Sequence, residues 1–353
     1  MTGQDHLLKS LGIQSVACSE LGSTMYGELL DRVSADVSAG GVFADVLSGH
    51  ENDPGPSALG LRLLGGLHRL VLDGRAADLR QWYPSVGGRW DIGAAWSDIV
   101  EVARSHADAL RLALEHPPQT NEVGRSAALA GGLLRLTTKY PLPVRLFEIG
   151  ASAGLNLRAE HYLYLHAGGQ WGRSDSPVVI GDAWRGRLPS RHELRISERT
   201  GYDISPIDPT TRDGELTLLS YVWPDMTARL RRLRGAIAIA RRVPASIHRS
   251  SAADAVATIR LSPGALTVVW HSATWQYLSK QEGTAVHDGI EALGAQASST
   301  APFVHLSMEP QRRHPGAPRE FLVRSRSWPE RRDLILGGCT PHGPPVTWEN
   351  RSC

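Results

Sequence analysis

The chain has 353 residues, of which 41% are hydrophobic and 21% charged, and this length allows one large domain or two smaller ones. With 38 basic and 36 acidic residues the formal net charge is +2, which argues against a nucleic-acid-binding protein. Three cysteines are too few for a disulfide framework or a zinc site, and no segment is long and apolar enough to span a membrane. The beginning of the sequence lacks a basic segment followed by an apolar run. We therefore expect a cytoplasmic protein with no membrane partner and no metal.

Residues 1–140 are predicted to form an all-α N-terminal region that packs on the rest of the chain. Its apolar residues recur at helical spacing, as Leu21, Met25, Leu29 and Val33 do. Four helices are expected in this region, over residues 21–37, 56–74, 91–115 and 120–140.

Residues 141–353 alternate between strand and helix patterns, with an inserted segment near 161–190. This alternation predicts an α/β domain with a mostly parallel sheet. The expected strands cover 144–149, 195–203, 245–247, 265–270 and 302–307, followed by a hairpin of 321–324 and 333–336. The expected helices cover 225–242, 253–260 and 281–297.

A glycine-containing turn follows the first of these strands. Glu148 lies near the strand's carboxyl end, Gly150 and Gly154 bracket the turn, and a helix is expected to begin near Asn156. Glycines let a ligand approach the backbone, and a helix N-terminus offers free N–H groups to it. Two chemistries share this pattern: the glycine loop that binds S-adenosylmethionine in class I methyltransferases, and the G-x-S-x-G nucleophile elbow of α/β-hydrolases, with Ser152 as nucleophile.

The hydrolase interpretation requires several strands before the elbow and a glycine-rich oxyanion loop. About 140 residues with helical patterns precede Ser152 instead. The order Ser…Asp…His can be filled by Ser152, Asp208 and His342, but a chain with 14 histidines offers such a fit easily. The surrounding chain therefore favours the methyltransferase interpretation, in which Asp203, at the end of the second strand, binds ribose hydroxyls.

Ligands of parallel sheets bind beyond the carboxyl ends of the strands, and this rule selects further candidates. His271 follows a buried strand and is a candidate general base, with Glu122 as the other catalytic candidate. Asn121 and Arg125 are four residues apart on an expected helix and share a face. Ser272 and Glu309, at two other strand ends, join Asn121 and Arg125 as candidate substrate-binding residues.

Six motifs resemble those of a bacterial family, domain-of-unknown-function family 2332. They are Pro117–Arg125, Glu148–Leu157, Asp203–Asp208, Val222–Pro224, Val268–Ser272 and Pro341–Gly343. The resemblance spans nearly the whole chain and implies a Rossmann-like core similar to class I methyltransferases. It also implies a cofactor site formed by Glu148, Gly150, Ser152, Gly154, Asn156 and Asp203. Two features depart from the methyltransferase pattern: Ser152 replaces the middle glycine, and Ser250-Ser251 stands where a Gly-Asp-like pair is expected.

The leading functional prediction is S-adenosylmethionine-dependent methyl transfer to a small molecule, with S-adenosylmethionine as cofactor. One alternative is a repurposed Rossmann-like enzyme or ligand-binding protein without methyl transfer. The other is the Ser152 hydrolase. The motifs specify neither the methyl acceptor nor an oligomeric state, and the functional prediction rests largely on fold similarity.

Overall fold

A computed structural model describes residues 2–54, 57–189 and 192–350. Its internal contacts divide the chain into two compact units. Unit 1 comprises residues 1–120 together with 211–231, and unit 2 comprises residues 121–210 together with 232–353. No helix in the described ranges is both long enough and apolar enough to cross a bilayer.

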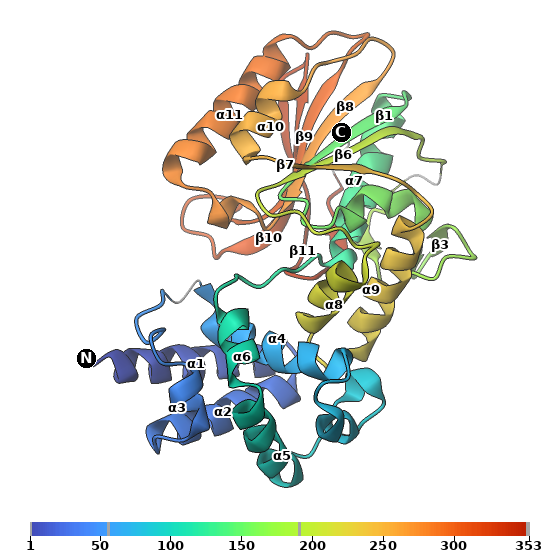
Figure 1. The fold of residues 1–353 in the computed structure, drawn as a ribbon. Helices are drawn as coiled ribbons and strands as arrows, with labels where there is room; N and C mark the ends of the chain where they lie inside the picture. The colour runs from blue at the N-terminus through green and yellow to red at the C-terminus, as the bar shows by residue number, and fades with distance from the viewer. Residues whose placement is uncertain (1, 55–56, 190–191, 351–353) are drawn as a thin grey trace. The chain divides into compact units, whose positions relative to one another are not determined.

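Unit 1 is helical (Figure 1). Its helices are α1 (Gly3–Glu20), α2 (Thr24–Ser38), α3 (Val42–Val46), α4 (Leu59–Leu72), α5 (Ile92–Ser105), α6 (Ala107–Leu114) and α8 (Arg212–Ser220), with the 3₁₀ turns η2 (Ala77–Trp82) and η3 (Pro84–Val86). The next helix, α9 (Thr227–Ala240), begins in unit 1 and ends in unit 2.

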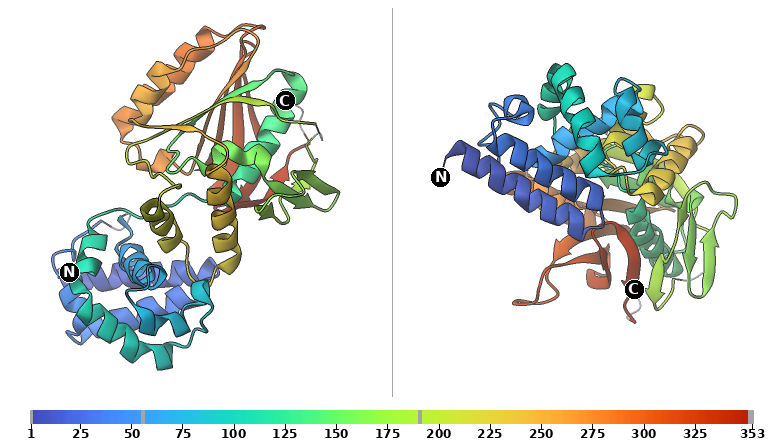
Figure 2. Two further views of the ribbon diagram at one scale, coloured as in Figure 1. Left: turned by 45° about the vertical axis from the view of Figure 1, so that its right-hand side comes forward. Right: turned by 90° about the horizontal axis from the view of Figure 1, so that it is seen from below.

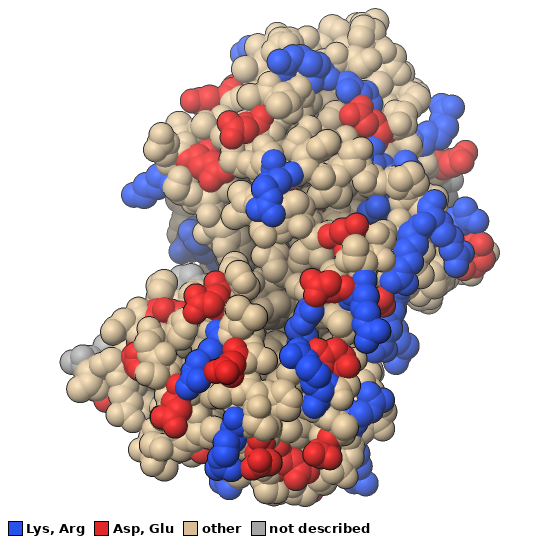
Figure 3. Space-filling view, in the orientation of Figure 1, with Lys and Arg blue, Asp and Glu red and all other residues tan. Residues whose placement is uncertain are grey.

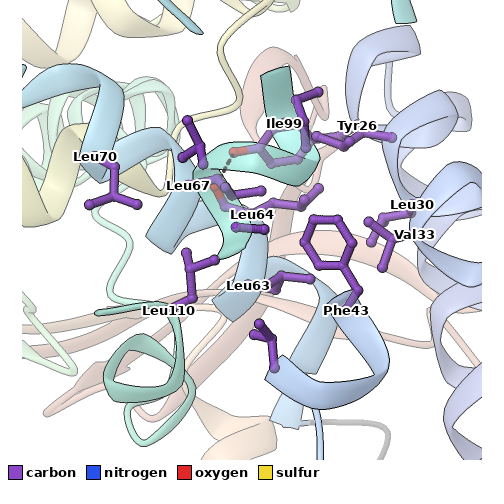
Figure 4. Close-up of a cluster of buried hydrophobic side chains, with 14 of the residues drawn as sticks. Tyr26, Leu30, Val33, Phe43, Leu63, Leu64, Leu67, Leu70, Ile99 and Leu110 are labelled. Atoms are coloured by element: carbon purple, nitrogen blue, oxygen red, sulfur yellow. Dashed lines mark hydrogen bonds between the residues drawn. The ribbon is translucent and has the colours of Figure 1, made fainter. Parts of the chain in front are cut away.

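The core of unit 1 is built from the apolar stripes that the sequence shows (Figure 4). Leu30 of α2 and Leu63 of α4 are fully buried, as is Phe43 of α3. The Tyr26 hydroxyl, also buried, donates to the carbonyl of Leu64 at 3.2 Å, so this polar group is satisfied inside the apolar cluster.

Unit 1 is helical, as expected, but α1 and α3 lie outside the expected helices, and the limits of the other helices differ. The helix expected over 91–115 is two helices, because the backbone breaks at His106 between α5 and α6. The helix expected from residue 21 is α2, which begins at Thr24 and is capped by the Ser23 side chain. Pro56, the expected start of another helix, lies outside the described residues, and α4 begins at Leu59. No helix was expected over the residues of α8.

Unit 2 contains a mixed sheet, mostly parallel, with nine strands among the described residues. Their order is β5-β12-β11-β10-β9-β8-β1-β6-β7. The strands are β1 (Val144–Ile149), β5 (Trp184–Gly186), β6 (Ile196–Asp203), β7 (Ser246–Arg249), β8 (Leu266–Ser272), β9 (Phe303–Gln311), β10 (Glu320–Trp328), β11 (Arg332–Thr340) and β12 (Gly343–Trp348).

The parallel part of this sheet is β7-β6-β1-β8-β9, which in chain order of these five strands reads 3-2-1-4-5. Dinucleotide-binding folds share this order, and their ligands bind at the point where it reverses. Here the reversal lies between β1 and β8, the two most buried strands. The remaining strands, β10 to β12, form an antiparallel meander that continues the sheet from β9.

Helices cover both faces of the sheet (Figures 1 and 2). On one face, α10 (Ala252–Thr258) and α11 (Lys280–Ala295) pack on Phe147, Ile149 and Val269. On the other, α7 (Ser126–Lys139) packs so closely that its Gly132 leaves no room for a Cβ beside Leu306. We call these the α11 face and the α7 face. Because strand side chains alternate, Glu148 and Trp270 point to the α7 face, and His271 points to the α11 face.

The insertion between β1 and β6 forms a small three-stranded sheet in the order β3-β2-β4. Its strands are β2 (Leu163–His166), β3 (Gly169–Gly172) and β4 (Val179–Ile180). The expected insertion is present; β2 and β3 form an antiparallel hairpin, and β4 pairs with β2 in parallel. The same insertion also supplies β5, which joins the edge of the large sheet beside β12.

Candidate functional site

The turn after β1 has an unusual backbone. Gly150, Ser152 and Gly154 all have positive φ, at 69°, 52° and 64°. A Cβ on Gly150 would lie 2.5 Å from the Thr274 hydroxyl oxygen, and one on Gly154 would lie 2.4 Å from Ile247. Both glycines are therefore required by conformation and by space, whereas Ser152 holds a left-handed conformation that costs a non-glycine residue free energy.

Two side chains from other segments hold this turn. The Ser152 amide donates to Asp203 Oδ2 at 2.8 Å, and the Leu155 amide donates to Asn121 Oδ1 at 2.9 Å. The expected helix after the turn is wrong: residues 155–161 form the 3₁₀ segment η5, and its first amide is already bound by Asn121. The loop therefore offers a ligand a fixed, closely approachable backbone rather than a free α-helix N-terminus.

Glu148 is buried beneath this turn, with 2% of its surface exposed. The pKa of Glu148 is raised to about 8, chiefly by burial and also by the Asp203 carboxylate, while Trp270 and the guanidinium groups of Arg125 and Arg158 act in the opposite direction. Its Oε2 atom accepts no hydrogen bond from any described residue. A buried carboxyl group without a partner is stabilised when a ligand brings a positive charge or a hydrogen-bond donor to it.

Two more buried acceptors on the same turn have no partner among the described residues. They are Ser152 Oγ and Asn156 Oδ1, and both side chains are at least nine-tenths buried. The amide nitrogen of Asn156 donates to the Glu122 carbonyl at 3.3 Å, which turns its oxygen away from that contact. Unsatisfied buried acceptors are rare in native proteins, so three of them around one turn indicate a site for a ligand rich in donors.

The segment before α7 lies beside this turn. It does not begin a helix, as expected, because Asn121 and Glu122 precede the short 3₁₀ segment η4 (Val123–Arg125) and so share no helix face with Arg125. Glu122 Oε1 accepts the Gly124 amide at 3.0 Å, while its Oε2 lies 3.4 Å from His342 Nδ1. Glu122 is buried, and both ring nitrogens of His342 are also shielded from solvent, although other atoms of its side chain are part-exposed.

Arg125 ties the same segment to two strand ends. Its side chain donates to the Ser272 carbonyl at 3.2 Å and to the Pro341 carbonyl at 3.1 Å. Ser272 is buried at the carboxyl end of β8. The structure therefore brings Asn121, Glu122 and Arg125 close to the glycine turn and to Ser272. Only Ser272 among them follows the end of a strand, where ligands of parallel sheets bind.

His271 and Glu309 lie elsewhere. His271 Nδ1 is 2.7 Å from Glu309 Oε1 on the α11 face, while Glu148 points to the α7 face. His271 Nε2 meets a further histidine, His305 Nε2, at 2.9 Å. A single cleft containing both the glycine turn and His271 is therefore wrong: the alternation of β8 turns His271 away from its neighbour Trp270.

Sequence reasoning missed His305, although a signal was available. Glu309 and His305 are separated by four residues within one strand, so they share a face with the intervening Ser307. Because the expected strand ended at residue 307, Glu309 seemed to follow it. In the structure β9 continues to Gln311, and His305 and Glu309 both face His271.

A family model described as "Uncharacterized protein conserved in bacteria (DUF2332)" matches residues 9–348. The chain belongs to this family. No curated protein and no solved structure matches it significantly. The expected family is thereby confirmed over nearly the whole chain, and the α/β architecture is confirmed by the sheet.

The nucleophile elbow of a hydrolase is not assembled in this family member. Ser152 Oγ has no hydrogen-bond partner among the described residues, so no base touches it. The other two residues of the hypothetical triad have different partners: Asp208 accepts from Thr210, and His342 pairs with Glu122.

Ser251, where the methyltransferase pattern expects an acidic or glycine residue, caps α10 by accepting the Asp254 amide at 3.1 Å. Helix capping therefore explains the serine at this position, and no bound ligand is needed to explain it. Among the described residues, no group of three or more His, Cys, Asp and Glu side chains is arranged to hold a metal ion.

Charges of both signs are spread over the surface, and the face in Figure 3 shows this mixture. Arginines gather along α9, whose sequence includes Arg229, Arg231 and Arg234. Elsewhere in that view, red and blue side chains are scattered among uncharged ones.

Proposed function

We propose that the chain is an S-adenosylmethionine-dependent methyltransferase acting on a small molecule, with its cofactor at the glycine turn. One observation carries this proposal. Three buried acceptors without partners, Glu148 Oε2, Ser152 Oγ and Asn156 Oδ1, surround a turn at the reversal point of a 3-2-1-4-5 sheet.

The residues fit this cofactor in charge and in hydrogen-bonding type. S-adenosylmethionine carries an ammonium group, a sulfonium centre and ribose hydroxyls, which are cationic or donate hydrogen bonds. Glu148 and Asn156 would hold the ammonium group, and Gly150 would allow the close approach that its φ of 69° and missing side chain provide. Asp203 accepts one amide on each carboxylate oxygen, and the remaining lone pairs are available to ribose hydroxyls.

The bound cofactor would supply an electrophilic methyl group, and the chain's own task is to position the acceptor and remove its proton. Glu122 with His342 is the best-placed pair for that proton, because it adjoins the glycine turn through the Asn156 contact. Arg125 and Ser272 would form the adjoining wall. His271, on the α11 face, is not part of this proposed site.

The test is thermal unfolding with and without S-adenosylmethionine or S-adenosylhomocysteine. Ligand at about a hundred times its dissociation constant stabilises a protein by roughly 2.7 kcal/mol, a shift of a few degrees for a chain of this size. We expect both ligands to stabilise the protein, and Asn156→Asp, which keeps an acceptor, to bind more tightly than Asn156→Leu. The absence of any shift at millimolar ligand would refute the proposal.

Binding and methyl transfer have separate readouts. A protein that binds S-adenosylmethionine but never forms S-adenosylhomocysteine with any acceptor is a ligand-binding or repurposed member of the fold. If an acceptor is found, Glu122→Gln should lower kcat more than it changes cofactor affinity, because the amide keeps its shape but cannot take a proton.

A further inference from the structure

The α11 face of unit 2 contains a cavity of about 660 Å³ that the proposed methyl transfer does not use. Its volume lies in the range of small-molecule sites. The cavity is lined by His271, Trp275, Gln276, His287, His305, Ser307, Glu309, Pro310, Gln311, Arg319, Arg324, Arg326 and Asp333. Three arginines and three histidines in this lining face two carboxylates, so a cationic ligand is disfavoured.

Three hydrogen-bonded side chains, Glu309, His271 and His305, form a row along one wall of this cavity. Glu309 Oε1 accepts from His271 Nδ1 at 2.7 Å and from the Thr274 amide at 2.8 Å. In the uncharged histidine pair, His271 Nε2 then carries a lone pair, and His305 Nε2–H donates to it across 2.9 Å. His305 Nδ1 is left as an acceptor, and no described residue donates to it.

The groups packed around His305 keep it uncharged. Burial lowers the pKa of His305 well below its ordinary value, and four cationic or titratable neighbours lower it further. They are His271 on β8, His287 on α11, and Arg324 and Arg326 on β10. Although burial also raises the pKa of Glu309, the hydrogen bonds from His271 and two amides bring it below its ordinary value. Glu309 is therefore the charged end of this hydrogen-bonded row.

The arginines differ in what already binds them. Arg324 makes two contacts to Asp333, at 2.6 and 2.7 Å, and Arg326 pairs with Glu291. Arg319, exposed at the cavity rim, makes no hydrogen bond or ion pair with any residue in the described ranges. Its guanidinium remains available to a ligand, and such groups bind carboxylate and phosphate oxygens.

We propose that this cavity is a second ligand site, which binds a small oxyanion that also carries a hydroxyl group. Arg319 binds the oxyanion and His305 Nδ1 accepts the hydroxyl hydrogen. If the hydroxyl is deprotonated, its proton moves to His305 Nδ1 while the Nε2 proton of His305 passes to His271 Nε2. The resulting imidazolium then lies against the Glu309 carboxylate, and no other reactant is needed.

The test uses nitrogen-15 spectra of the histidine side chains in the full-length protein. Glycolate, acetate and inorganic phosphate are titrated at constant ionic strength, with chloride as the control. We expect glycolate or phosphate to shift the His305 ring signals saturably, and acetate, which has no hydroxyl, to bind more weakly than glycolate. A response to phosphate alone identifies a phosphate-type ligand, and a response to glycolate alone a hydroxycarboxylate.

Two variants locate the site. Arg319→Gln should weaken the titration about tenfold, the usual loss for a charge-assisted hydrogen bond, whereas the exposed Arg332→Gln, outside the cavity, should leave it unchanged. His305→Gln should abolish the preference for glycolate over acetate. If neither glycolate nor phosphate gives a response beyond that of chloride, or if Arg332→Gln weakens it as much as Arg319→Gln, the second site does not exist. None of these measurements involves S-adenosylmethionine, so their outcome is independent of the proposed methyl transfer.

Discussion

The backbone amide of Thr274 donates to Glu309 Oε1 at 2.8 Å on the α11 face of the sheet. The side chain of the same threonine fills the space beside Gly150, at the glycine turn. Ala273, just before it, has a positive φ of 51°, which makes the chain turn sharply after β8. This single turn therefore contacts both candidate sites, and changes at one can reach the other through Thr274.

A substitution at Gly150 should show this close packing. Gly150→Ala combines a φ of 69° with a Cβ only 2.5 Å from the Thr274 hydroxyl oxygen. Because threonine is β-branched, it has few alternative rotamers that would relieve this clash. Gly264→Ala is the matched control, because its φ of 78° carries the same backbone strain with nothing within 4 Å. We expect the control to lose about 1–2 kcal/mol of unfolding free energy and Gly150→Ala clearly more, measured by urea denaturation. Equal losses would mean that Thr274 moves away at no cost.

The buried carboxyl of Glu148 should make stability depend on pH. Its pKa is raised to about 8 in the folded protein, so the folded state holds a proton that the unfolded chain releases above its ordinary pKa. Folding stability should therefore fall as pH rises from about 5 to 8, with a slope of up to about 1.4 kcal/mol per pH unit from this group. Glu148→Gln should remove that slope in urea unfolding series measured across this range.

The control for this experiment is Glu20→Gln, which changes an exposed glutamate at the end of α1. It should leave the pH dependence as in the wild-type protein. If Glu148→Gln and wild type lose stability in parallel between pH 5 and 8, then Glu148 is already ionised in the folded state, and its pKa is not raised by burial.

The strands around the site could be predicted because burial on both faces gives them runs rich in β-branched and large apolar residues, as in residues 266–270. β12 could not, because it contains Pro344 and Pro345, which the strand pattern disfavours, and it is held by pairing with β11 and β5. Residues that follow strand ends in sequence, such as Asp203 and Ser272, lie near the glycine turn in the structure. The sequence did not reveal that His271 lies on the α11 face. Strand side chains alternate between the two faces, so the face of a residue near a strand end depends on whether the strand still includes it.

The left-handed conformation of Ser152 yields a third prediction. With φ at 52° and no hydrogen bond to its hydroxyl within the described chain, this serine has conformational strain and no side-chain hydrogen bond to lose. Ser152→Gly should therefore be more stable than Ser152→Ala by about 0.5–1 kcal/mol in chemical denaturation. A fluorophosphonate probe should label none of the three proteins, since no base contacts the hydroxyl. Labelling that disappears in both variants would instead revive the hydrolase interpretation.

Asp203 has two roles that one pair of variants can separate. Its carboxylate accepts the buried Ser152 amide and the exposed Ser205 amide, each at 2.8 Å, and the proposed function adds ribose hydroxyls. Asp203→Asn keeps one acceptor oxygen for Ser152, so hydrogen exchange at that amide should stay slow, whereas Asp203→Ala leaves the amide without an acceptor and should speed its exchange. We expect the asparagine variant to bind S-adenosylhomocysteine about tenfold more weakly than wild type despite its intact turn, because a neutral amide oxygen is a poorer partner for hydroxyls. Wild-type affinity in Asp203→Asn, combined with lost affinity in Asp203→Ala, would restrict Asp203 to holding the turn and leave the ribose without its proposed ligand.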